Sequence, residues 1–324
     1  MNKTVKIVIY ITIAVLLLTA ITFGAVYWYQ KNRLEGKLVF NHAYDAGDAV
    51  DHISIVTHNG TIELLKDEGY WTLQNYNGYH ADYNLISDFL DTVNNSHYMV
   101  KLDTDKTKLN NMLLGNPDEA QQNAGMMIKI YAAGKKVDDL IVGIKDTERG
   151  YFTARKSDSQ DAWLVSGNYN IPYSPKDWLP NPIMELPESS IQMFSIDGGL
   201  IARQMAMEDF RDRLDLKVNV NWLLQNLAAL NIDDVLPQSE FDKRFPEIRI
   251  AKIYDITTFY GLQFELKFYQ TADKDVWVNI NLLSDGLAAK VVDDYIKENS
   301  FLYDGWYFQI SPLQKDLFIN YRLM

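Results

Sequence analysis

The residues best suited to metal chemistry lie in one acidic stretch near the start of the folded part. Its members are three histidines and three aspartates, namely His42, His52, His58, Asp45, Asp48 and Asp51. Imidazole and carboxylate groups are ligands for divalent metals, so a metal site is one interpretation. None of the five histidines forms a His-Glu-x-x-His pair, however, and an acidic, solvated lead-in to a β-hairpin is the simpler explanation. We therefore predict no metal and no cofactor.

Adjacent carboxylates offer a second candidate chemistry. They occur in three pairs, Asp138-Asp139, Asp233-Asp234 and Asp293-Asp294. A glycosidase holds two carboxyl groups about 5–10 Å apart across a cleft, whereas neighbours on a strand point to opposite faces. A nucleophile elbow is also missing, because Ser166-Gly167 lacks the pattern Gly-x-Ser-x-Gly. A hydrolase is thus the least favoured interpretation, and we predict that the chain is not an enzyme and has no catalytic residues.

Aromatic side chains are the better indication of function. Tyr76, Tyr79, Tyr83 and Tyr98 cluster around a helix that the sequence predicts over residues 81–94. Most aromatic residues of a folded protein pack in or near its core. An exposed group of tyrosines would instead suit recognition of a sugar or a protein segment, because tyrosine combines an apolar body with a polar tip. These four tyrosines are the candidate binding residues.

Composition narrows the classes of partner and chemistry. The 324-residue chain has a net charge of −12, but residues 1–40 hold five Lys or Arg and one Glu, so the remainder carries −16. A body this acidic repels phosphate backbones, which argues against nucleic acid as a partner. Cysteine is absent, so the chain forms no disulfide and no metal–thiolate site. Aromatic residues reach 13%, which favours a β-rich fold.

Residues 7–29 contain no charged side chain. As a helix they would extend about 34 Å, enough to cross a hydrocarbon core about 30 Å thick. The alternative is a cleaved signal peptide, but its apolar core would be shorter and would end at a small-x-small site. We predict a short N-terminal tail (1–6), a single transmembrane helix (7–29) and a juxtamembrane collar (30–42). The short tail before a long folded body favours an extracytoplasmic, periplasmic body on a cell inner membrane.

The rest of the sequence divides into two similar halves. Residues 43–187 alternate strand patterns with one amphipathic helix, and an Asn59-Gly60 turn predicts the first hairpin. Residues 188–324 repeat this order, with a hairpin around Gly198-Gly199 and a helix over 218–230 whose apolar face includes Trp222. The expected fold class is α+β: a transmembrane helix followed by two tandem mixed α/β repeats with largely antiparallel sheets.

Several motifs in the first half resemble a known family. They are Thr61-Ile-Glu-Leu-Leu-Lys with Gly69-Tyr-Trp71, His80-Ala-Asp82, Gly150-Tyr-Phe-Thr-Ala-Arg155, Ala162-Trp-Leu-Val-Ser166 and Pro175-Lys-Asp-Trp178. Together they resemble domain of unknown function 4340 (DUF4340) over most of residues 50–200, with a weaker second copy behind. The resemblance implies a membrane helix, an extracytoplasmic tandem-repeat body and, in some relatives, a place beside ABC transporters of the gliding-motility type. It implies no catalytic residues.

Two functions remain after these exclusions. The first is a membrane-anchored, extracytoplasmic interaction module, a non-enzymatic accessory subunit of an ABC transporter or another cell-envelope complex, with a membrane or envelope protein as partner. The second is an envelope protein that binds a glycan or a lipid headgroup in a groove between the two halves. Both rest on the uncharged segment at residues 7–29 and the duplicated body behind it.

Overall fold

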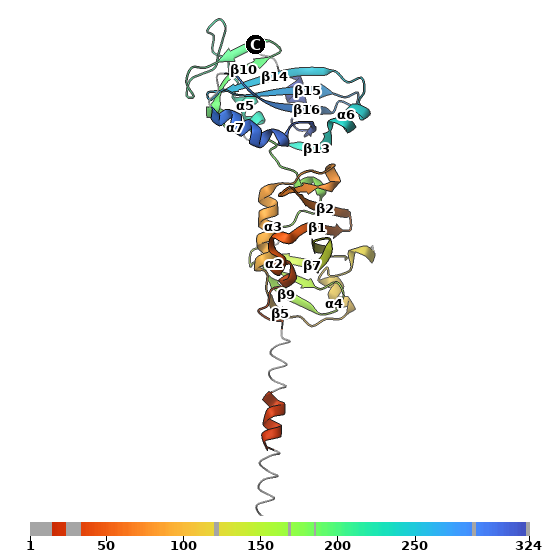
Figure 1. Ribbon diagram of the computed structural model, residues 1–324. Coiled ribbons are helices and arrows are strands. Elements are labelled where there is room, and N and C mark those ends of the chain that lie inside the picture. The colour runs from red at the N-terminus through yellow and green to blue at the C-terminus, as the bar shows by residue number, and fades with distance from the viewer. Residues whose placement is uncertain are drawn as a thin grey trace, which may run out of the picture.

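The computed structural model describes residues 15–23, 34–119, 123–167, 170–184, 186–286 and 290–321. Two units, each built around one β-sheet, follow each other along the molecule (Figure 1). Every strand pairing within the two sheets is antiparallel. The predicted mixed α/β fold with two largely antiparallel sheets is confirmed.

The first unit contains a nine-stranded sheet in the order β4-β3-β2-β1-β6-β7-β8-β9-β5. Its strands are β1 (Val50–Thr57), β2 (Gly60–Asp67), β3 (Tyr70–Leu73), β4 (Tyr79–His80), β5 (Tyr98–Lys101), β6 (Met126–Ala132), β7 (Lys135–Asp146), β8 (Tyr151–Arg155) and β9 (Ala162–Ser166). Its helices are α2 (Asn41–Ala46), α3 (Tyr83–Asn95) and α4 (Lys106–Asn111), with short 3₁₀ helices η1 (Gly47–Ala49), η2 (Gln74–Tyr76), η3 (Pro117–Glu119) and η4 (Pro175–Trp178).

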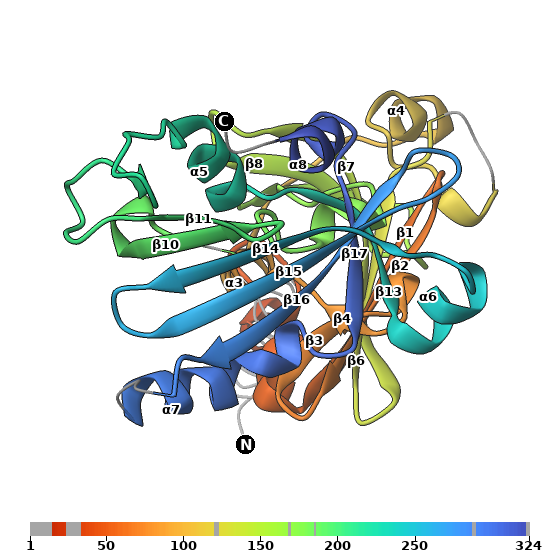
Figure 2. The same cartoon turned by 90° about the horizontal axis from the view of Figure 1, so that it is seen from above.

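The second unit contains an eight-stranded sheet in the order β12-β11-β10-β14-β15-β16-β17-β13. Its strands are β10 (Ile191–Ile196), β11 (Gly199–Ala202), β12 (Arg211–Asp212), β13 (Ile232–Pro237), β14 (Ile250–Thr258), β15 (Leu262–Gln270), β16 (Val276–Ser284) and β17 (Trp306–Ile310). Its helices are α5 (Asn221–Ala228), α6 (Gln238–Arg244), α7 (Lys290–Asn299) and α8 (Lys315–Asn320), with η5 (Glu188–Ser190) and η6 (Ser300–Leu302). Figure 2 shows this sheet from above.

The two sheets share one topology. When β1 is matched to β10 and the later strands follow in chain order, the arrangement β3-β2-β1-β6-β7-β8-β9-β5 corresponds strand for strand to the second sheet. The helices α3 and α5 occupy equivalent places in the chain order. Helix α3 follows β3 and β4 and precedes β5, and α5 follows β12 and precedes β13. Only β4 has no counterpart in this matching.

Turn chemistry sets the register of the hairpins. The two-residue loops Glu68-Gly69, Ala133-Gly134 and Asp197-Gly198 each have positive φ at both positions. This is the type I′ conformation, whose twist matches that of the flanking strands. A glycine at the second position of each loop adopts this conformation without the steric cost that a side chain would bring.

The amphipathic helices cover the sheets as their periodicity predicts, with one exception. In α3 the side chains of Ile86, Phe89 and Val93 are buried, and its N-cap Asp82 accepts hydrogen bonds from two backbone N–H groups. In α5 the buried residues include Leu224, whereas Trp222 is 57% exposed, so its predicted place on the buried face is wrong. Trp222 instead stacks beside Tyr321 on the surface, with a ring separation of 6.5 Å.

The predicted transmembrane segment is only partly described. Residues 15–23 are helical, whereas residues 7–14 and 24–29 of the predicted span, like the tail 1–6 and the collar residues 30–33, lie outside the described residues. Within the part of the chain that the structure describes, no helix has both the length and the apolarity needed to cross a bilayer.

Candidate functional site

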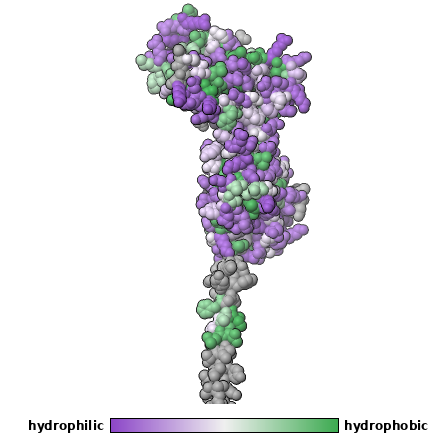
Figure 3. Space-filling model, in the orientation of Figure 1, coloured by the Kyte–Doolittle hydropathy of each residue, from purple (hydrophilic) through white to green (hydrophobic). Residues whose placement is uncertain are grey.

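A large hollow lies where the two units meet. It has a volume of about 940 Å³. The first unit contributes the β2–β3 turn, β4 and the N-terminal half of α3, and the second unit contributes the end of α7 and η6. In surface view the molecule narrows between the units (Figure 3). We refer to this hollow as the junction groove.

Three aromatic rings from both units form one wall of the junction groove. Tyr70, His80 and Phe301 contact one another with ring centroids 5.6 Å (Tyr70–His80), 5.0 Å (Tyr70–Phe301) and 4.8 Å (His80–Phe301) apart. Trp71 and Tyr83 also line the groove, and Tyr83 is 80% exposed. Exposed aromatic faces beside polar groups are typical of sites that bind a ligand with both apolar and polar edges.

Local structure explains why these rings converge. The type I′ turn at Glu68-Gly69 starts β3 at Tyr70, so this tyrosine emerges directly from the tight turn. Asp82 caps α3 and also donates its backbone N–H to the carbonyl oxygen of Trp178, at 2.8 Å. The helix therefore begins immediately after β4, which sets Tyr83 at the rim and His80 against the wall.

His80 is a polar group within this aromatic wall. Burial lowers the pKa of its imidazole, so the ring is neutral at pH 7. Its Nδ1 atom is buried and has no hydrogen-bond partner among the described residues. Buried polar atoms nearly always have a partner, so an unpaired one in the wall of a groove is consistent with a water or ligand group beside it.

The structure separates the four predicted binding tyrosines. Tyr79 is fully buried at the junction, where its hydroxyl donates to the carbonyl oxygen of Leu302 at 2.9 Å. Tyr76 is half-buried, and burial followed by the charges of Asp234, Asp233 and Asp177 raises its pKa. Tyr83 lines the junction groove.

Tyr98 lies apart from the other three. It is buried on β5, 5.2 Å from the ring of Trp163, and burial with the nearby charges of Asp138 and Asp139 raises its pKa to about 12. The four tyrosines therefore do not form one exposed cluster. Sequence reasoning missed Phe301, which comes to Tyr70 from more than two hundred residues away and carries no local signal.

The histidine and aspartate side chains of residues 42–58, which the sequence offered as possible metal ligands, do not come together at one point. His52 contacts the carboxylate of Glu63 at 2.6 Å and stacks on Tyr131. His42 lies 3.4 Å from Asp138 on β7. Over the described ranges, no three His, Asp or Glu side chains come close enough together to hold a metal ion.

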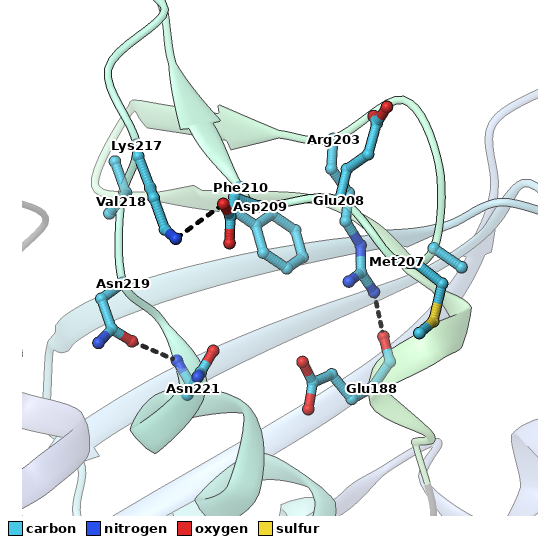
Figure 4. Close-up of a pocket in the computed structure, with 11 residues that line it drawn as sticks. Glu188, Arg203, Met207, Glu208, Asp209, Phe210, Lys217, Val218, Asn219 and Asn221 are labelled. Atoms are coloured by element: carbon cyan, nitrogen blue, oxygen red, sulfur yellow. Dashed lines mark hydrogen bonds and ion pairs between the residues drawn. The ribbon is translucent and has the colours of Figure 1, made fainter.

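A smaller pocket of about 300 Å³ lies at the η5, β11 and α5 end of the second unit (Figure 4). Its two basic side chains already have internal contacts. Arg203 donates to the backbone carbonyls of Ile191 and Glu188 and lies 4.4 Å over the ring of Phe210, and Lys217 pairs with Asp209 at 2.7 Å. The junction groove, which is larger and has exposed rings, is the better candidate binding site.

Comparison with known proteins gives one match. The sequence profile of the domain of unknown function DUF4340 matches residues 71–245, more than half of the chain. The chain belongs to the DUF4340 family. Neither a curated protein nor a solved structure matches it.

The match to DUF4340 begins at Trp71, in β3 of the first sheet, and ends at Phe245, the residue after α6. It therefore includes the first-unit part of the junction groove, with Trp71, His80 and Tyr83, but ends before η6 and Phe301. The resemblance seen in the sequence of the first half is confirmed by this DUF4340 match.

Proposed function

We propose that this DUF4340 protein is a membrane-anchored, extracytoplasmic binding module without catalytic activity. It would act as an accessory subunit of an ABC transporter or another cell-envelope complex, held at the inner membrane by residues 7–29. The proposal is supported by the uncharged sequence of this segment and by the duplicated body that follows it.

The exposed apolar helix at residues 15–23 supports the proposal that this segment is a membrane anchor. Its large side chains are 53–78% exposed, and they are Val15, Leu16, Leu17, Leu18, Ile21 and Phe23. In Figure 3 the coloured part of the segment below the body is mostly green, the colour of hydrophobic residues. Soluble proteins rarely expose so many contiguous apolar side chains, and such surfaces mark membrane or protein contacts. Each of these side chains would gain about 1.5–3 kcal/mol on transfer out of water.

Membrane fractionation tests the anchor. We expect the full chain to remain in the membrane pellet after carbonate extraction, and a chain lacking residues 1–33 to appear in the soluble fraction. Protease added outside the cytoplasm should digest the body, because the short N-terminal tail favours this orientation. A mature protein found in the soluble fraction without its first twenty-odd residues would instead show a cleaved signal peptide and contradict the anchor.

Proximity labelling tests the accessory role. A labelling enzyme fused to the C-terminal end of the full chain should biotinylate subunits of an envelope complex in intact cells, more strongly than the same enzyme on the unrelated anchor of another protein. A labelling pattern identical to that of the unrelated anchor would remove the accessory interpretation.

The junction groove favours a second candidate function, the binding of a glycan or a lipid headgroup. Apolar ring faces can stack on the C–H face of a sugar, while side chains such as Lys297, Asn299 and Asp91 at the same groove can hydrogen-bond its hydroxyl groups. An extracytoplasmic location would place such ligands within reach.

Two tyrosines of similar exposure test ligand binding at the groove. Tyr83 is 80% exposed and lines the groove, whereas Tyr260 is 75% exposed and is not among the groove residues. An envelope extract or a defined oligosaccharide should raise the melting temperature of the natural chain. Tyr83→Ala should weaken this binding by about 1–2 kcal/mol, roughly 5- to 30-fold, and Tyr260→Ala should leave it unchanged. No shift with any glycan or short-chain phospholipid would exclude this function.

A further inference from the structure

Residues 36–39, close to the start of the described body, are fixed to the edge of the first sheet. Gly36 donates its N–H to the carbonyl oxygen of Tyr98 at 2.7 Å, and Tyr98 donates to that of Lys37 at 3.0 Å. Val39 donates to the carbonyl oxygen of Ser96 at 2.9 Å. Residues 36–39 therefore lie along β5 on the side that β9 leaves free, and cover this edge of the sheet.

A turn sets the direction in which the chain enters the first unit. Lys37 donates its backbone N–H to the carbonyl oxygen of Leu34 at 2.9 Å, which closes a β-turn. Gly36, at the third position of this turn, has φ of +78°, as a type II turn requires. The next residues, Val39 and Phe40, are fully buried, so the turn cannot swing away from the body.

This end of the first unit exposes three apolar side chains close to the turn. Leu34 is 37% exposed, and Met99 and Val100 on β5 are 44% and 52% exposed. Figure 1 shows β5 and β9 at the end of the unit where the chain enters from its N-terminal part.

The length of the intervening chain limits how far this surface can lie from the anchor. Four residues lie between Tyr29, the last residue of the predicted anchor, and Leu34, so the chain takes five Cα–Cα steps from one to the other. Even fully extended they span at most about 18 Å. A surface tethered this closely is within reach of the headgroup layer, where apolar side chains gain by partial burial.

Charged side chains accompany the apolar ones at this end. Lys101 pairs with Asp161 at 2.7 Å, and Lys108 pairs with Asp103. The sequence adds Lys31, Arg33 and Lys37 between the predicted anchor and Val39, so anionic lipid would add an electrostatic attraction to the apolar contact.

We propose that Leu34, Met99 and Val100 form a membrane-contact surface, which rests on the outer headgroup layer of the same bilayer that holds the anchor. This proposal rests on the anchor of the proposed function and specifies how the body is seated on the membrane. The turn at Leu34–Lys37 and its hydrogen bonds to β5 would fix the position of this surface relative to the anchor.

The natural absence of cysteine allows a site-specific test. Val100→Cys places a single thiol for a fluorophore in the membrane-contact surface, and Leu313→Cys, at a 95% exposed position of the second unit, is the control. Each labelled full chain is reconstituted in phosphatidylcholine nanodiscs, with and without lipids that carry a nitroxide in the headgroup. We expect about threefold stronger quenching at residue 100 than at residue 313, because only residue 100 would lie at the lipid surface.

The outcomes separate this proposal from the anchor. Incorporation into nanodiscs with equal quenching at both positions overturns the membrane-contact surface alone. Failure of the natural full chain to incorporate overturns the anchor and the membrane-contact surface together.

Discussion

Tyr79→Ala will lower the free energy of unfolding of the body by about 3–5 kcal/mol, the usual cost of removing a buried aromatic ring. The side chain is fully buried and reaches from β4 into the second unit. Its ring lies 4.9 Å from that of Trp306 and 5.4 Å from that of Phe308, and its hydroxyl donates to Leu302. Denaturant unfolding, read by the m-value as well as the midpoint, would measure the effect.

Two tyrosine variants give the matched controls for Tyr79→Ala. Tyr79→Phe keeps the ring and removes only the hydroxyl, so it should cost about 1 kcal/mol. Tyr83→Ala removes a ring that is 80% exposed, and its effect should stay within about 0.5 kcal/mol. If Tyr79→Ala cost no more than Tyr83→Ala, the junction would not depend on this ring. A lower m-value for Tyr79→Ala would show that the two units no longer unfold together.

Asp138→Ala is expected to cost about 3 kcal/mol, because it removes a buried carboxylate together with its ion pair to Lys156 and its hydrogen bond from the backbone N–H of Ala43. The carboxylate is 2% exposed and accepts hydrogen bonds from Lys156 Nζ and from the backbone N–H of Ala43, both at 2.9 Å. Lys156 also donates to the carbonyl oxygen of Val39, at 3.0 Å. One carboxylate thus fixes the collar and α2 to β7, and thermal or denaturant unfolding would measure its loss.

An exposed ion pair of the same unit provides the control for Asp138. Asp161→Ala removes the partner of Lys101, and because both side chains are about half exposed the cost should be under about 1 kcal/mol. Asp138→Asn should fall between the two alanine variants, since the amide can still accept one hydrogen bond but carries no charge. Equal costs for Asp138→Ala and Asp161→Ala would show that burial adds nothing to this pair.

These two contacts lie in different parts of the first unit, Asp138 on the interior strand β7 and Tyr79 on the edge strand β4. Asp138 fixes the segment that arrives from the N-terminal side, and Tyr79 fixes the second unit to the first. Weakening either contact should therefore lower the stability of the fold, and loss of the Tyr79 contact should also loosen the second unit from the first.

Local sequence signals account for much of the fold. The first hairpin and the helix with Ile86, Phe89 and Val93 on its buried face were predicted from turn residues and from a 3.6-residue period, both of which act over a few neighbours. The loop of that hairpin is His58-Asn59, however, because Gly60 already pairs with Thr57. The edge strands β5 and β13 were not predicted, because four to six residues at a sheet edge carry little alternation. Their positions depend on β9 and β17, which come more than sixty residues later.

The candidate site was less accessible to sequence reasoning. Four tyrosines near one helix look equivalent in the sequence, yet Tyr79 is buried, Tyr83 is exposed and Tyr98 packs at the far edge of the sheet. Which of them faces solvent depends on the second unit and on β9, and neither is adjacent in the chain. Trp222 shows the same limit, since an aromatic residue at helical spacing was assigned to the core and lies on the surface.

The strand order also determines how the protein can be shortened. A fragment cut to the family match, residues 71–245, would keep β3 but lose β1 and β2, the two strands that connect β3 to β6. It would likewise keep β10 and β13 and lose all four strands that lie between them. Such a fragment would expose open backbone edges in both halves and would be prone to aggregate. Truncated versions for crystallisation or antibody production should therefore start no later than residue 34 and continue through α8.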